Sequence, residues 1–134
     1  MILGSCRVIG LLAETPRLVQ APWLARGKGS LPALLILLFA GHALCDYPLQ
    51  GQFLSDAKNH RRPNVSEHWA RALFAHSMIH CGMVYLVTGS VILALAELVI
   101  HAATDWAKCD GRISSTADQG IHYACKIAWA FMAR

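Results

Sequence analysis

The stretch LLILLFAGHALCDYPLQ, residues 34–50, decides the fold because it joins a membrane-like apolar run to two ionisable side chains. His42 and Asp46 are four residues apart, so a helix places them on one face, about 6 Å apart along its axis. The same spacing recurs in three later segments: His76 with His80, His101 with Asp105, and Asp118 with His122. The chain is therefore expected to form helices that each carry one pair of ionisable residues.

Composition favours an integral membrane protein with the lipid bilayer as its partner, and leaves a soluble helical bundle as the alternative. Hydrophobic residues make up 55% of the 134 residues and only 15% are charged, which departs from the usual balance of soluble domains. The net charge is +4, but no basic stripe is interleaved with aromatic residues, so no nucleic acid partner is expected. The five cysteines form no CxxC pair, which argues against a disulfide framework or a zinc ribbon.

The chain divides into a leader over residues 1–30 and a helical domain over residues 31–134. The leader is basic and has no apolar run long enough for a membrane span, so it is expected to be poorly structured or to follow a misassigned start codon. Turn signals and apolar runs predict a polar loop at 51–67 and four helices, at 31–49, 68–87, 91–108 and from 117 towards the C-terminus. The predicted fold class is an all-α, antiparallel four-helix transmembrane bundle.

Antiparallel helices bring the four pairs to one end of this bundle. The first and third pairs stand near the ends of their helices, whereas the second and fourth stand in the first half of theirs. Imidazole and carboxylate groups without thiolate suit a divalent metal such as zinc, manganese or iron, and eight of them are enough for two ions. The alternative is that they are hydrogen-bonded core residues that bind nothing. The predicted ligands are His42, Asp46, His76, His80, His101, Asp105, Asp118 and His122.

A second polar layer is expected one turn deeper in the bundle. Glu97 precedes His101 by four residues and Lys126 follows His122 by four, so the same antiparallel geometry places both at similar depth. They are expected to pair directly or through water. The alternative for Lys126 is that its ammonium reaches the membrane interface along its own alkyl chain.

Three further polar residues are expected to support the ligands from the open end of the site. Gln50 and Gln119 are predicted to orient ligand side chains, and Lys108 to reach the same mouth. Two other histidines, His60 and His68, fall in or beside the 51–67 loop and are expected to be solvated.

The motifs HALCDYPLQ (42–50), HSMIH (76–80), HAATDWAK (101–108) and DQGIH (118–122) occur in that order. The set resembles a family of small bacterial and phage integral membrane proteins catalogued as domain of unknown function 3307, with the pattern HxxxDxxxQ, HxxxH, HxxxDxxK, DQxxH. The resemblance runs from about residue 31 to the C-terminus. It implies a multi-pass protein of the bacterial inner membrane, and it implies no activity.

Basic residues predict that the site end faces the cytoplasm, because positive charges stay on that side of the membrane. The four basic residues of the leader argue for the opposite orientation. The basic residues expected at the site end are Lys58, Arg61, Arg62, Lys108 and Arg112.

Three functions are compatible with these features. The first is a metal-dependent hydrolase at the cytoplasmic membrane surface, in which Arg61, Arg62 or Lys108 holds a phosphate. The second is an ion or proton transport or relay module, which would need a homo-oligomer because four short helices leave little room for alternating access. The third is a structural membrane protein whose polar pairs specify helix packing without catalysis.

Overall fold

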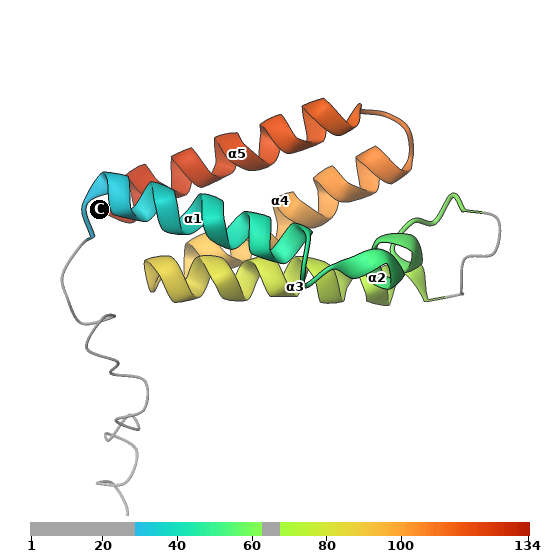
Figure 1. Cartoon of the computed structure of the whole chain (residues 1–134), viewed down its shortest axis with the longest axis horizontal. Helices are drawn as coiled ribbons and strands as arrows, with labels where there is room; N and C mark the ends of the chain where they lie inside the picture. The colour runs from blue at the N-terminus through green and yellow to red at the C-terminus, as the bar shows by residue number, and fades with distance from the viewer. Residues whose placement is uncertain (1–28, 63–67) are drawn as a thin grey trace, which may run out of the picture.

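The computed structural model describes residues 29–62 and 68–134, and within them the chain is all α-helical (Figure 1). The predicted leader lies outside the described residues except for its last two positions. The helices are α1 (Leu31–Asp46), α2 (Gly51–Ala57), α3 (Trp69–Thr88), α4 (Val91–Cys109) and α5 (Ser115–Met132). The all-α prediction is confirmed, but the expected loop at 51–67 is wrong in part because α2 forms inside it.

Local sequence signals set the ends of the long helices. Ser30, Ser90 and Ser114 precede α1, α4 and α5, and each side chain accepts a hydrogen bond from the backbone N–H three residues later. α3 ends at Thr88 and is capped by Gly89, whose φ of 67° is a left-handed conformation that favours glycine. The tight break between α3 and α4 therefore follows directly from the Thr88-Gly89-Ser90 sequence.

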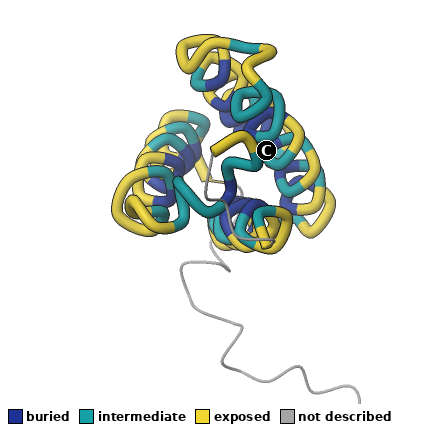
Figure 2. Tube along the Cα trace, turned by 90° about the vertical axis from the view of Figure 1, so that its right-hand side faces the viewer, coloured by how far each residue is buried: buried dark blue, intermediate teal, exposed yellow. Residues whose placement is uncertain are grey.

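The four long helices pack side by side in alternating directions. α1 contacts α3 and α5, and α4 contacts the same two helices, so the four close a ring (Figures 1 and 2). Their buried faces point into this ring and their exposed faces point outward (Figure 2). α2 departs from the axis of α1 by 79° and packs against α3 near the end where α1 stops.

The interior changes from apolar to polar along the bundle. At the end that holds the start of α1 and the chain terminus, a buried apolar cluster closes the interior: Leu34, Leu38, Val84, Leu93, Trp129 and Ala130. Further along, α1 and α3 approach closely at Gly41, where an added Cβ would lie 2.6 Å from Met83 Cγ. The buried ionisable residues fill the interior beyond this apolar end.

One helix among the described residues, Trp69–Thr88, is long and apolar enough to cross a membrane. Leu31–Asp46 and Gly51–Ala57 reach the same criterion only as a combined span, which their 79° bend interrupts. The structure therefore does not confirm the predicted four-span transmembrane bundle.

Candidate metal centre

The eight predicted ligand residues lie together where the polar interior begins. Seven of them are at most 2% exposed, and Asp46 is the eighth, with a side chain 13% exposed. The imidazole rings stack against one another, with ring centroids 3.7 Å apart for His80 and His101 and 4.2 Å apart for His101 and His122. The structure thus brings residues from α1, α3, α4 and α5 into one cluster, as the spacing of the pairs requires.

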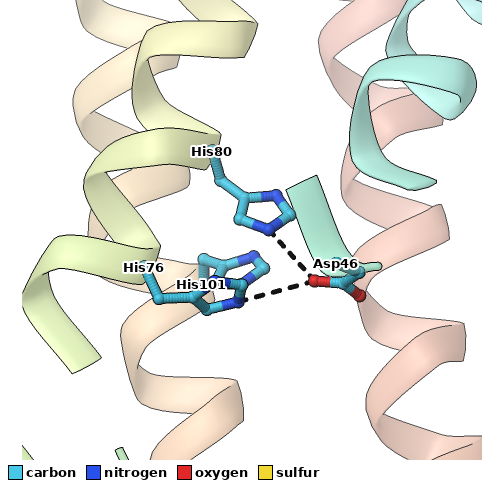
Figure 3. Close-up of side chains that lie close together, drawn as sticks. All are labelled: Asp46, His76, His80 and His101. Atoms are coloured by element: carbon cyan, nitrogen blue, oxygen red, sulfur yellow. Dashed lines mark hydrogen bonds and ion pairs between the residues drawn. The ribbon is translucent and has the colours of Figure 1, made fainter. Parts of the chain in front are cut away.

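Four of these residues converge on a point where one ion could sit (Figure 3). Asp46 Oδ1 lies 3.0 Å from His80 Nε2 and 3.5 Å from His76 Nε2. His76 Nε2 in turn lies 3.1 Å from His101 Nε2. One ligand atom from each residue lies within 4.8 Å of the other three, so three imidazoles and one carboxylate from α1, α3 and α4 could bind a single divalent metal.

Two further groups of potential ligands adjoin this one. Asp105, Asp118 and His122 meet the same 4.8 Å limit, and so do Glu97, His101 and His122. Both oxygens of Glu97 already accept hydrogen bonds, so the group that contains Glu97 is the less available for a metal.

His42 lies beside these groups without belonging to any of the three found among the described residues. Its Nε2 is 3.3 Å from Asp46 Oδ2 and 3.4 Å from Gln119 Oε1. The amide of Gln119 also donates to Asp46 Oδ2 at 3.1 Å. His42 and Gln119 therefore contact the outer oxygen of Asp46, whereas Oδ1 faces the imidazoles of α3.

The deeper layer contains the ion pair expected between Glu97 and Lys126. Lys126 Nζ donates to Glu97 Oε1 at 2.5 Å, and His101 Nδ1 lies 3.3 Å from the same oxygen. Sequence reasoning missed Trp129, whose Nε1 donates to Glu97 Oε2 at 2.7 Å. Its position three residues after Lys126, on the same face of α5, was the available signal.

Lys58 was expected at the site end only as a basic residue, and its buried contact with Asp105 was not predicted. It stands at the C-terminal end of α2, is only 4% exposed, and its ammonium donates to Asp105 Oδ2 and, at 2.7 Å, to Gln50 Oε1. Gln50 was expected to orient a ligand side chain; α1 ends at Asp46, and the Oε1 of Gln50 accepts a hydrogen bond from Lys58. Gln50 instead positions Lys58, which holds Asp105.

Lys108 reaches the mouth of the site as expected, and it is not free there. Its ammonium donates to Asp118 Oδ2 at 2.7 Å and lies 3.5 Å from Asp105 Oδ1. The two candidate phosphate-binding arginines are also engaged, since Arg61 pairs with Asp110 and Arg62 with Asp56.

Asp110 joins the α2–α3 connection to the end of α4 at the rim of the site. It accepts hydrogen bonds from Arg112 and Arg61 and lies 3.3 Å from His60 Nε2. These hydrogen bonds, of which that from Arg112 has the largest effect, hold the pKa of the Asp110 carboxyl well below its usual range. The expectation that His60 is solvated is wrong, because its ring stacks on Trp106 and its side chain is only 15% exposed.

The chain matches the family described as "Protein of unknown function (DUF3307)" over residues 34–133, from the first turn of α1 to the end of α5. This chain belongs to the DUF3307 family. No curated protein and no solved structure matches it. The buried cluster of this DUF3307 chain is therefore interpreted from its own geometry.

Charge balance in the buried cluster leaves room for a cation. Four carboxylates, those of Asp46, Glu97, Asp105 and Asp118, face three ammonium groups, those of Lys58, Lys108 and Lys126. With neutral imidazoles the cluster carries one net negative charge, which either a bound cation or one proton on an imidazole would balance. One divalent ion would reverse that sign and draw anionic groups towards the mouth.

The cluster also contains buried polar atoms that have no hydrogen-bond partner. Among the described residues, buried atoms without a hydrogen-bond partner include one ring nitrogen on each of the five clustered histidines and Asp118 Oδ1. Buried polar groups are normally paired, and each exception costs about 1–3 kcal/mol. Of these atoms, His122 Nε2 and Asp118 Oδ1 lie 3.4 Å apart at one place where a ligand could bind, whereas the unpaired nitrogens of the other four rings are Nδ1 atoms, not the Nε2 atoms that meet near Asp46.

Proposed function

We propose that this chain is a membrane-embedded metalloprotein that uses its buried centre for hydrolysis at the cytoplasmic membrane surface. The observation that carries the proposal is the convergence of Asp46, His76, His80 and His101 within 4.8 Å. Histidine and carboxylate ligands are compatible with zinc, manganese or iron. A metal held there would lower the pKa of a bound water and supply a nucleophile near neutral pH.

Asp105 is placed to hold such a water close to the ligand atoms. Its Oδ2 lies 3.5 Å from His76 Nε2 and 3.8 Å from His101 Nε2, directly beside the proposed ligand atoms. Lys58 fixes the same carboxylate from the side of α2.

The distribution of apolar and charged residues supports a membrane location. Of the charged residues that make α4 and α5 less apolar, Glu97, Asp105, Asp118 and Lys126 are buried inside the bundle, and Lys108 lies at the mouth of the site. The outer surface of the four long helices is apolar instead, an arrangement suited to lipid. Exposed apolar side chains include Ile36 and Leu37 on α1, Phe74 and Leu86 on α3, Ile92 and Val99 on α4, and Ile127 and Phe131 on α5.

The rim around the site supports a cytoplasmic orientation. Arg61, Arg62, Arg71 and Arg112 are exposed there, and Trp69 and Trp106 lie among them, as interfacial aromatic residues do. This orientation places the mouth of the site at the level of the lipid headgroups on the cytoplasmic side. In a bacterium this would be the inner membrane, and extraction with alkaline carbonate should leave the protein in the membrane fraction.

A proton or ion relay is the second candidate, and a specific line of contacts favours it. His122 lies 3.4 Å from Asp118, stacks on His101, and His101 lies 3.3 Å from Glu97, which pairs with Lys126. This line of buried ionisable groups follows the bundle axis and stops at the apolar cluster. Transport would therefore require a homo-oligomer or a rearrangement of that end.

Elemental analysis of the detergent-purified protein tests the metal centre. The wild-type chain should contain at least one equivalent of zinc, manganese or iron, and His76→Ala and His80→Ala should lose it. His68→Ala is the matched control, because His68 is exposed at the start of α3 and touches none of the cluster. A wild-type protein that is free of metal yet fully stable would contradict the proposal.

Activity assays separate the two candidate functions. Hydrolysis of phosphodiester or amide substrates in proteoliposomes should disappear in His76→Ala and persist in His68→Ala. Ion flux that is abolished by Glu97→Gln, without any hydrolysis, would favour the relay. The absence of metal, hydrolysis and flux together would indicate that the polar pairs only specify helix packing.

A further inference from the structure

Asp105, Asp118 and His122 form a second convergent group on α4 and α5. His122 Nε2 lies 3.4 Å from Asp118 Oδ1 and 3.7 Å from Asp105 Oδ1. All three residues are at most 2% exposed. Two carboxylate oxygens and one imidazole nitrogen therefore face a shared point in the interior, beside the group formed by Asp46, His76, His80 and His101.

Two of these three atoms have no hydrogen-bond partner among the described residues. They are His122 Nε2 and Asp118 Oδ1, on side chains that are 1% and 0% exposed. The two atoms lie 3.4 Å apart and face each other across the shared point without forming a hydrogen bond. An imidazole nitrogen and a carboxylate oxygen left unpaired at the same place are the ligands that a divalent cation binds.

Lysine side chains hold the opposite oxygen of each carboxylate. Lys108 donates to Asp118 Oδ2 at 2.7 Å, and Lys58 donates to Asp105 Oδ2. The remaining oxygen of each carboxylate, Oδ1, faces His122, and Asp105 Oδ1 also lies 3.5 Å from Lys108 Nζ. Hydrogen bonds that orient a ligand from behind are characteristic of built metal sites.

Asp105 lies between the two groups. Its Oδ1 faces His122, and its Oδ2 lies 3.5 Å from His76 Nε2. One carboxylate therefore contacts ligand atoms of both groups, which is the position of a bridging ligand in a two-metal site.

We infer that Asp105, Asp118 and His122 hold a second divalent cation and that Asp105 bridges it to the first, so that the site takes a phosphate ester as its substrate. The inference rests on the proposed metal centre. Two cations a short distance apart stabilise the attacking and leaving oxygens of a displacement at phosphorus.

Charge selects this substrate class. Because Lys58 and Lys108 already neutralise Asp105 and Asp118, a second cation leaves the buried cluster strongly positive. An anionic group at the mouth relieves that excess. The second cation is therefore expected to bind weakly alone and at least ten-fold more tightly when phosphate is present.

Manganese titration of the full detergent-purified chain tests this, with binding followed by equilibrium dialysis and electron paramagnetic resonance. In the presence of inorganic phosphate the wild-type protein should bind two equivalents and give the spectrum of an exchange-coupled pair. Asp118→Asn and His122→Gln should each bind one equivalent with an uncoupled six-line spectrum. Asp56→Asn is the matched control, because Asp56 pairs with Arg62 outside the cluster and should leave both equivalents in place.

Each result has one meaning. One equivalent in both the wild type and Asp118→Asn overturns the second site and leaves the first intact. Two equivalents without exchange coupling overturn the bridge by Asp105. No bound manganese in any protein overturns both centres. Two coupled equivalents without hydrolysis support the second site and contradict the proposed hydrolase.

Repeating the manganese titration with two different anions identifies the source of the phosphate. Tighter binding of the second manganese with inorganic phosphate, but not with nanodiscs containing phosphatidic acid, supports a soluble phosphate ester. The opposite result supports a lipid headgroup. No effect of either anion overturns the assignment of the substrate class.

Discussion

Lys126 Nζ lies 2.5 Å from Glu97 Oε1, and both side chains are at most 2% exposed. The pair links α5 to α4 at the boundary between the apolar cluster and the histidines. Trp129 and His101 contact the same carboxylate, so Glu97 is shared by the ion pair, the core and the candidate metal centre. Replacing only one partner of the pair therefore leaves the other charge buried without its counter-charge.

Lys126→Met should destabilise the protein by about 3–5 kcal/mol, because it leaves the Glu97 carboxylate buried without its counter-charge. The double variant Glu97→Gln/Lys126→Met should recover most of that loss, since it removes both charges while keeping similar volumes. Thermal unfolding of the purified full chain measures both. Equal destabilisation by the single and double variants would show that the ion pair is not coupled.

Metal should stabilise the folded chain through the group of Asp46, His76, His80 and His101. A ligand at about 100 times its dissociation constant adds about 2.7 kcal/mol to the free energy of unfolding. A chelator should therefore lower the melting temperature of the wild type and of His68→Ala, and should leave that of His76→Ala/His80→Ala unchanged. A chelator effect of the same size in the double variant would place the metal elsewhere.

Gly41→Ala should destabilise the α1–α3 contact. The new Cβ would lie 2.6 Å from Met83 Cγ and 2.8 Å from its Sδ, so the methionine must shift, at a cost of roughly 1–3 kcal/mol for overpacking. Met83→Ala in the same chain should relieve the clash. Gly82→Ala is the control, because a Cβ there meets no atom within 4 Å and a helix-interior alanine gains about 1 kcal/mol over glycine. A Gly41→Ala chain that is as stable as the Gly82→Ala chain would contradict the close approach.

Asp110 should make the stability of the folded chain depend on pH in the acid range. Its pKa is lowered in the folded chain by Arg112, Arg61 and His60, so its contribution is fully present above the unfolded pKa of about 3.9 and is lost as pH falls towards the folded value. Asp110→Asn should lower the melting temperature at pH 7, and the gap from the wild type should narrow below about pH 4. A gap that stays constant down to pH 3 would show that the charge of Asp110 contributes nothing.

Several features of the site could be predicted from the sequence alone. His101 and Asp105 had to share a face because they are four residues apart in a helix, and so did Asp118 and His122. The depth of Glu97 relative to Lys126 followed from helix direction alone. Only the pairing atoms, such as Lys126 Nζ with Glu97 Oε1, required side-chain positions.

Other features depended on long-range packing. Lys58 reaches Asp105 because the chain bends by 79° after α1 and α2 packs back against α3, and no local signal in residues 47–62 specifies that return. His60 is covered because Trp106, 46 residues later in the sequence, stacks on it. A loop that is polar in composition can still enter a site when its polar groups find charged partners there.

The sequence by itself determined the four long helices, their alternating directions and the common depth of the ionisable pairs, because residue spacing and short turns specify these locally. The tertiary structure decided which atoms meet: that Asp46 faces the imidazoles of α3 while His42 lies beside it, and that Asp105 stands between two groups of ligands. Rotation of each helix about its axis and the path of α2 determine those contacts. Both depend on how all the helices pack together, which residue spacing within one helix does not specify.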